Sequence, residues 1–239
     1  MAARGYTGRM STQVPPGPQR TVLKHDTLGA IVLERDGPGA RILREPGQAV
    51  WGLRTVSGWV AANERRALAR LQGLDGVPAV EAGHGRRGHA RSFIPGREMR
   101  DGGITDPAYF VQARRLLAAL HRRGVAHNDL AKEANWLVDD AGRPALVDFQ
   151  MAWVSPRRSR FFRLLCREDL RHLLKHKRMY FPERLTPVEK RLLKRRSWVR
   201  ELWFRTGKPV YRFLTRRVLK WEDNEGRGHA PPSRSNKDH

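Results

Sequence analysis

One segment constrains the fold of this chain more than any other: HNDLAKEANWLVDDAGRPALVDFQ, from His127 to Gln150. Two short apolar runs, Trp136–Val138 and Ala145–Val147, flank a polar turn that contains a glycine. Apolar runs separated by such a turn are typical of a β-hairpin. The hairpin would place Asn135, just before its first strand, beside Asp148, just after its second strand.

The polar side chains of this segment suit one kind of chemistry. Asp129, in the loop before the hairpin, offers a carboxylate that could act as a general base or orient a hydroxyl. Asn135 and Asp148 offer oxygen ligands, which suit Mg²⁺, a cation that also binds substrate phosphates. One free carboxylate beside an Asn and an Asp on a metal is the arrangement that phosphoryl transfer uses.

The same residues resemble two motifs of the protein-kinase-like superfamily. His127–Leu130 resembles its H-R-D-L catalytic loop, and Asp148-Phe149-Gln150 resembles its D-F-G. The resemblance implies that Asp129 is the catalytic base, that Asn135 and Asp148 bind Mg²⁺, and that ATP is the phosphoryl donor. It also implies that His127 braces the loop.

Two departures from the common kinase pattern point to a subgroup. The interval from Asp129 to Asn135 is one residue longer, and Gln150 replaces the glycine of D-F-G. The loop lysine is also displaced by one position, to Lys132, which we predict to be catalytic. With these features the chain resembles the small atypical kinases, such as the RIO-type kinases and the bacterial lipopolysaccharide-core kinases.

In the N-terminal half, the resemblance assigns further residues to ATP. The Lys24–Ala30 stretch stands where the glycine-rich loop is expected, and Gly29 is its one glycine. Arg44 occupies the position of the phosphate-binding lysine, with Lys24 as an alternative. Glu64, on the next helix, is predicted to position that cation, and residues 93–96 to form the hinge against adenine.

The predicted elements indicate an α+β, bilobal fold. Strands are expected at 21–24, 30–34, 40–44, 77–80 and 89–94, with one helix at 59–71 among them, and helices at 107–123, 167–178, 187–205 and 209–221. Segregated strands and helices of this kind favour a small β-rich lobe followed by a mainly helical lobe. We predict a disordered tail at 1–20, an N-lobe at 21–95, a C-lobe at 96–200, and a basic amphipathic helix with a disordered tail at 201–239.

The net charge of +23 is concentrated toward the C-terminus. From Arg157 onward, 25 Lys and Arg stand against 9 Asp and Glu, a net of +16. Such a field attracts anions, so this third of the chain could meet an anionic membrane surface or RNA. A solvated basic face is the alternative. His121, His172 and His176 lie beside basic residues on predicted helices, and we expect them at the surface.

Other features bear on location. Cys166 is the single cysteine, so no internal disulfide can form, and we assign it no chemistry. No stretch of 18 apolar residues suggests a spanning helix, and the N-terminus lacks the apolar core of a secretory signal. We therefore expect a cytoplasmic protein. The basic region also allows the alternative that the protein binds peripherally to the inner membrane.

Three functions remain open from the sequence. The first is an atypical kinase whose acceptor is a protein serine or threonine, with a sugar or lipopolysaccharide-core hydroxyl as the rival acceptor. The second is a pseudokinase that keeps the fold as a binding module, which the scarcity of glycines and Arg44 favour. The third is a nucleic-acid-binding protein without chemistry, which leaves the opening segment unexplained.

Overall fold

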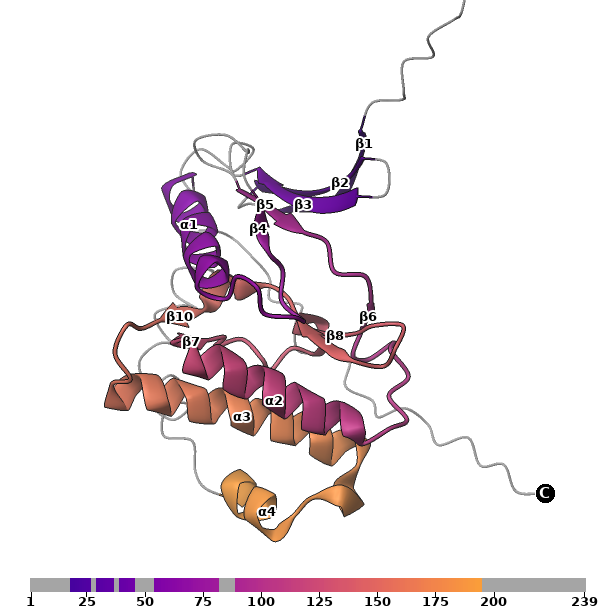
Figure 1. The fold of residues 1–239 in the computed structure, drawn as a ribbon, viewed down its shortest axis with the longest axis vertical. Coiled ribbons are helices and arrows are strands. Elements are labelled where there is room, and N and C mark those ends of the chain that lie inside the picture. The colour runs from indigo at the N-terminus through magenta and orange to yellow at the C-terminus, as the bar shows by residue number, and fades with distance from the viewer. Residues whose placement is uncertain (1–17, 27–28, 37–38, 46–53, 82–88, 195–239) are drawn as a thin grey trace, which may run out of the picture. The chain divides into compact units, whose positions relative to one another are not determined.

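An antiparallel sheet of five strands forms the first part of the computed structural model, which describes residues 18–26, 29–36, 39–45, 54–81 and 89–194 (Figure 1). Its strands lie in the order β1 (Gln19–Asp26), β2 (Gly29–Asp36), β3 (Gly39–Glu45), β5 (His89–Ser92), β4 (Val80–Glu81). The first three are the predicted strands, each longer than predicted. Since β1 begins at Gln19, it includes the end of the segment predicted as a tail; residues 1–17 lie outside the described residues.

Helix α1 (Arg54–Arg70) is the one helix of this lobe, as predicted, and begins five residues earlier than predicted. Apolar residues that recur at helical spacing on it are buried: Val60, Ala67, Leu68 and Leu71 are each at most 7% exposed. After the helix the chain turns at Gly73, whose φ of 72° favours glycine. The helix thus covers one side of the lobe and, as shown below, also contacts the segment after Asp148.

A second lobe begins with β6 (Arg97–Glu98) and the helix α2 (Ala108–Arg122). Just before α2, Asp106 Oδ1 accepts a hydrogen bond from the Ala108 amide at 2.8 Å. The predicted hairpin is formed by β8 (Trp136–Val138) and β9 (Pro144–Leu146), which β6 extends to three strands. A two-stranded sheet joins β7 (Val125–Ala126) to β10 (Trp153–Val154).

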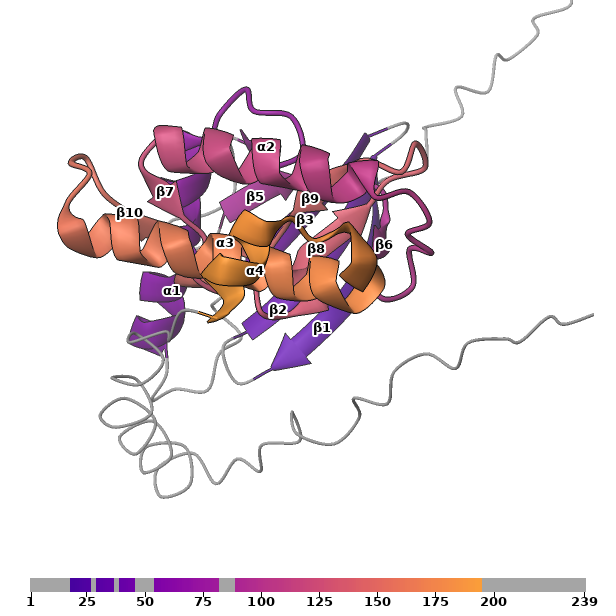
Figure 2. The ribbon, with the colours of Figure 1, turned by 90° about the horizontal axis from the view of Figure 1, so that it is seen from below.

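Helix α3 (Arg160–Tyr180) is longer than the helix predicted at 167–178 and lies beside α2, as Figures 1 and 2 both show. Its buried residues, among them Phe162, Leu165 and Leu173, recur at helical spacing on one side. The core of this lobe gathers side chains of α2, α3 and the hairpin around Trp136, which is fully buried. Helix α4 (Pro187–Lys194) follows and contacts α3.

The α+β fold class, with a β-rich first lobe and a mainly helical second lobe, is confirmed. The described residues, up to Lys194, belong to one compact unit. The helix predicted at 209–221 and the second half of the helix predicted at 187–205 lie outside the described residues. Among the described residues, none of the helices is both long and apolar enough to cross a bilayer.

Candidate functional site

The predicted catalytic loop follows β7 and begins at His127, whose side chain is fully buried. Its Nε2 lies 2.9 Å from the carbonyl oxygen of Val147, so Nε2 carries the proton and donates it. The imidazole also packs on Phe149, with ring centroids 4.6 Å apart. His127 therefore joins the loop to the strand that leads to Asp148, which is the bracing role predicted for it.

A buried carboxylate on α3 fixes the backbone of this loop. Asp169 is 1% exposed and accepts hydrogen bonds from the amides of His127 and Asn128, each at 2.8 Å. It also accepts one from His121 Nε2 at 3.0 Å. Asn128 has a φ of 65°, an unusual conformation for a residue other than glycine, and its bond to Asp169 offsets the cost.

The same side of α3 supports the loop at two further points. His176 Nε2 donates to the carbonyl of Leu130 at 2.9 Å, and burial lowers the pKa of this histidine, which keeps it neutral. The Tyr180 hydroxyl lies 3.1 Å from Glu133 Oε1 and 3.2 Å from the Met99 carbonyl oxygen. Positions 169, 176 and 180 fall on one helical face, so one helix holds the whole loop.

Within the loop, Asp129 is surrounded by two predicted site residues. Asn135 Nδ2 donates to the Asp129 backbone oxygen at 2.8 Å and to its carboxylate at 3.1 Å. Lys132 Nζ lies 3.3 Å from the same carboxylate oxygen, with about half of its side chain exposed. Since the Asn135 nitrogen is committed to Asp129, its amide oxygen is the atom that it can offer to a cation.

The hairpin brings Asp148 next to Asn135, as predicted. The Val147 amide donates to the Asn135 carbonyl oxygen at 3.1 Å, and Asp148 follows at once. Asp148 adopts a left-handed conformation, with φ 64° and ψ 67°, and caps the short 3-10 helix η4 (Phe149–Met151). Backbone strain of this kind in a residue other than glycine is common at functional sites.

Helix α1 contacts the segment after Asp148. Asn63 Nδ2 donates to the carbonyls of Gln150 at 2.9 Å and Ala152 at 2.8 Å. One residue further, Glu64 is 1% exposed, and its Oε1 lies 3.4 Å from Arg91 Nε on β5. Glu64 therefore faces a cation of the sheet, and Arg91, which the sequence did not single out, is one such cation.

The remaining predicted residues lie on the sheet. Arg44 is on β3, where the backbone register pairs it with Ile31 of β2 and His89 of β5. Lys24 is on β1, and Gly29 begins β2. The placement of the Arg44 and Lys24 side chains lies outside the description, so their contact with phosphate stays a prediction. Residues 93–96 connect β5 to β6 and so join the two lobes (Figure 1).

A cavity of about 850 Å³ lies elsewhere in this unit, between α2, the residues after α1 and the hairpin turn. Its apolar lining includes Leu71, Val77 and Leu116, and Arg115 and Asp139 also line it. Ile94 and Pro95 of the predicted hinge also line it, whereas Asp129, Asn135 and Asp148 do not. The cavity therefore lies beside the hinge and apart from the catalytic loop.

The donor set around Asp129 bears on which metal could bind. Within the part of the chain that the structure describes, no group of three or more His, Cys, Asp and Glu side chains could hold a metal ion. The candidate site instead offers the Asn135 amide oxygen and the Asp148 carboxylate. Two protein oxygens are few for Ca²⁺ or Zn²⁺, but they fit Mg²⁺, which completes its shell with water and phosphate.

Three histidines correct the expectation of a surface role. His176 is 6% exposed and bonds to Leu130, and His121 bonds to buried Asp169. His172 is partly buried, and burial, helped by the neighbouring Lys175, lowers its pKa to about 4. The signal in the sequence was the position of Asp169 and His176, which share a helical face with leucines. Cys166 is partly buried, and burial raises the pKa of its thiol to about 12.

Solved kinase structures have a fold similar to that of this chain. Rio2 kinase from Chaetomium thermophilum, in a complex described as ADP/Mg²⁺-phosphoaspartate, superposes with a TM-score of 0.52 at 16% identity, over 84% of this chain and 69% of that chain. A second structure of that Rio2 kinase gives 0.52 at 17%, over 71% and 60%. A structure of WbdD gives 0.46 at 19%, over 71% and 43%, which is too low to bear on the fold.

The likeness to Rio2 kinase shows the fold: this chain has a protein-kinase-like fold, as its motifs predicted. The chain spans between 60% and 69% of the length of the two Rio2 chains. No protein-family model matches the sequence, and neither does any curated protein.

Proposed function

We propose that this chain is a phosphotransferase that moves the γ-phosphoryl group of ATP to a hydroxyl group in the presence of Mg²⁺. The observation that carries the proposal is the pair of hydrogen bonds from Asn135 Nδ2 to Asp129. They orient the carboxylate and leave the amide oxygen of Asn135 available to bind a cation. Phosphoryl transfer needs both functions side by side: a carboxylate for the hydroxyl proton and oxygen ligands for the metal.

Each residue has a role in this proposal. Asp129 accepts the proton of the acceptor hydroxyl, or holds that hydroxyl in line with the phosphorus. Lys132, 3.3 Å from Asp129, places a positive charge beside the carboxylate, where it offsets negative charge during transfer. Asn135 and Asp148 would hold Mg²⁺, which supplies neutralisation of the phosphate charge when bound.

The N-terminal lobe supplies the nucleotide contacts. Arg44, on β3, would bind the phosphates, with Lys24 and the Gly29 turn on the neighbouring strands in support. Glu64 would position the cation, since it is buried and faces the cations of that sheet. The Rio2 kinase of the same fold was crystallised with ADP and Mg²⁺, which supports this choice of ligands.

The acceptor that we propose is a serine or threonine side chain of a protein. The support is the likeness of fold to Rio2 kinase together with the extended catalytic-loop interval between Asp129 and Asn135. A saccharide hydroxyl is the rival, and the test below includes it.

The test is transfer of label from γ-labelled ATP by the full-length chain with Mg²⁺. The acceptors are a soluble protein extract, a ribosome fraction and a membrane fraction that contains saccharide lipids. Asp129→Asn and Asp148→Ala should each lower transfer by about 100-fold or more, because each removes a group that acts on the transferred phosphoryl. Asp140→Asn is the matched control, since this exposed carboxylate lies in the hairpin turn.

Two results are decisive. Label that moves to protein in the wild type and is lost in both site variants, but not in the Asp140 control, supports the proposal; label on saccharide would identify the rival acceptor. If the wild type binds ATP but is as inactive as both variants, the chain is a nucleotide-binding module and the proposal is wrong.

A further inference from the structure

Three large apolar side chains protrude near the start of α3. Met151, Trp153 and Phe161 are 54%, 48% and 49% exposed. Met151 and Trp153 stand on either side of buried Ala152, and the rings of Trp153 and Phe161 meet edge to face with centroids 5.2 Å apart. Exposed side chains of this size that cluster, instead of being scattered singly, mark a contact surface.

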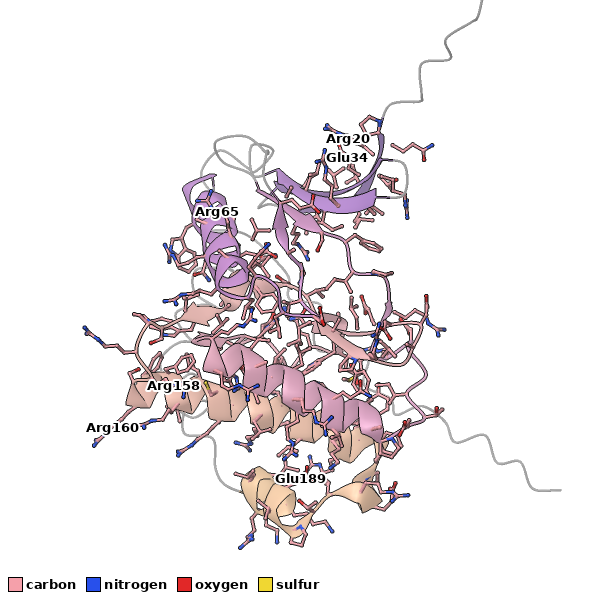
Figure 3. The ribbon with its side chains drawn as sticks, viewed as in Figure 1. Arg20, Glu34, Arg65, Arg158, Arg160 and Glu189 are labelled. Atoms are coloured by element: carbon pink, nitrogen blue, oxygen red, sulfur yellow. The ribbon has the colours of Figure 1, made fainter. Side chains whose placement is uncertain are left out.

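The same stretch of the chain is strongly basic. Residues 151–167 contain five arginines and no acidic residue: Arg157, Arg158, Arg160, Arg163 and Arg167. All five are exposed, and the last three recur at helical spacing along one side of α3. Figure 3 shows Arg158 and Arg160 at the first end of α3, where both extend away from the ribbon.

The structure holds this region in place. In the turn before α3, the Ser155 amide donates to the Gly124 carbonyl at 2.8 Å, and Arg158 Nη2 donates to the Arg122 carbonyl at 3.2 Å. Ser159 caps the helix by accepting from the Phe162 amide at 3.1 Å. The arginines are thus attached to a fixed scaffold.

The position of Arg160 and Arg163, in the first turn of α3, works against helix stability. No acidic residue lies in the first turn of α3, and arginines at the positive end of a helix are unfavourable. Among the described residues, no hydrogen bond or ion pair joins the guanidinium group of Arg157, Arg160, Arg163 or Arg167 to a partner that would offset this cost. A role of this positive surface in binding an anion would account for the cost in helix stability.

We propose that the surface formed by Met151, Trp153, Phe161 and the five arginines, the 151–167 surface, docks onto an anionic lipid bilayer. Aromatic and apolar side chains enter the interface between headgroups and acyl chains, while arginines meet the lipid phosphates. RNA fits less well, because the two rings contact each other and Met151 cannot stack on a base. The inference is independent of phosphoryl transfer.

The experiment is sedimentation of the full-length chain with vesicles of phosphatidylcholine that contain 30% phosphatidylglycerol, without nucleotide and at 0.15 M salt. Replacing Arg157, Arg160 and Arg163 by Gln should weaken binding by about 100-fold, or about fivefold for each arginine. Trp153→Ala together with Phe161→Ala should weaken it by about tenfold, because less apolar area enters the bilayer. The aromatic variant should keep the salt dependence of the wild type.

Matched controls separate this surface from the charge of the whole chain. Arg97, Arg114 and Arg184, all exposed and outside the surface, are replaced by Gln together. Because salt screens charges beyond about 8 Å, this control should weaken binding by about threefold or less. Val111→Ala with Val188→Ala is the control for the aromatic pair.

Three results would overturn the proposal. The first is vesicle binding that both surface variants leave unchanged, which would assign it to another part of the chain. The second is an equal loss in the arginine control. The third is binding to a single-stranded RNA homopolymer, but not to vesicles, that Trp153→Ala abolishes.

Discussion

Replacement of Asp169 by Asn is the sharpest test of how the catalytic loop is held. One carboxylate oxygen accepts from the His127 amide and from His121, and the other accepts from the Asn128 amide. An asparagine has nearly the same shape but only one acceptor oxygen. It therefore leaves at least one of the three donors facing an NH₂ group in a site that is 1% exposed.

The size of the effect follows from this count. The cheaper orientation keeps the asparagine oxygen on His127 and His121 and turns the NH₂ group toward the Asn128 amide. One hydrogen bond to a charged group is lost, at about 1.5–3 kcal/mol, and a donor is left without an acceptor, at about 1 kcal/mol or more. We expect Asp169→Asn to lower the free energy of unfolding by about 3 kcal/mol.

Urea unfolding followed by tryptophan fluorescence measures this, because Trp136 lies fully buried in the same lobe. Glu168→Gln is the matched control: it changes the adjacent, partly exposed carboxylate and should alter the unfolding free energy by less than about 0.5 kcal/mol. If Asp169→Asn were as stable as this control, the buried carboxylate would not anchor the loop and the reasoning would be refuted.

Three further predictions concern other parts of the fold. Gly124→Ala should destabilise the protein by at least about 2 kcal/mol more than Gly142→Ala in urea unfolding. Both glycines have positive φ, but only at Gly124 would a Cβ clash with a backbone oxygen, that of Ser155; equal costs would contradict this. Burial lowers the pKa of His172 to about 4, against about 6.5 in the unfolded chain. Between these values the unfolded chain binds the extra proton, so the free energy of unfolding falls as pH drops from 6.5 to 4, by up to about 1.4 kcal/mol per pH unit. His172→Gln should flatten that slope, and an unchanged slope would refute the lowered pKa of His172. Asn63→Ala should lower phosphoryl transfer while the protein stays folded, because it frees the segment after Asp148 from α1; full activity in this variant would show that the contact is unnecessary.

The hairpin could be predicted because its information is local. Two apolar runs around a glycine turn fix the strands, and the strands fix that Asn135 and Asp148 meet, as the bond from the Val147 amide to Asn135 shows. The apolar periodicity likewise predicted the buried face of α1. Local pattern and tertiary structure agree in these elements, which is why sequence reasoning succeeded there.

The support of the loop could not be predicted in the same way. Asp169 lies about 40 residues after the amides that it binds, and no local pattern indicates which backbone it will meet. Its position among leucines on one helical face was a usable signal, as was that of His176. Arg91 is a similar case, because its neighbour Glu64 lies on helix α1 and only the packing of that helix against the sheet brings the two side chains together.

The central claim is that Asn135 and Asp148 form a magnesium-dependent nucleotide site, and calorimetric titration with ADP tests it most directly. In the wild type, Mg²⁺ should tighten ADP binding by about tenfold or more, and Asp148→Asn should remove that coupling while Asp140→Asn keeps it. If ADP bound with the same affinity with and without Mg²⁺, or if Asp148→Asn left the coupling intact, the proposed site would be wrong.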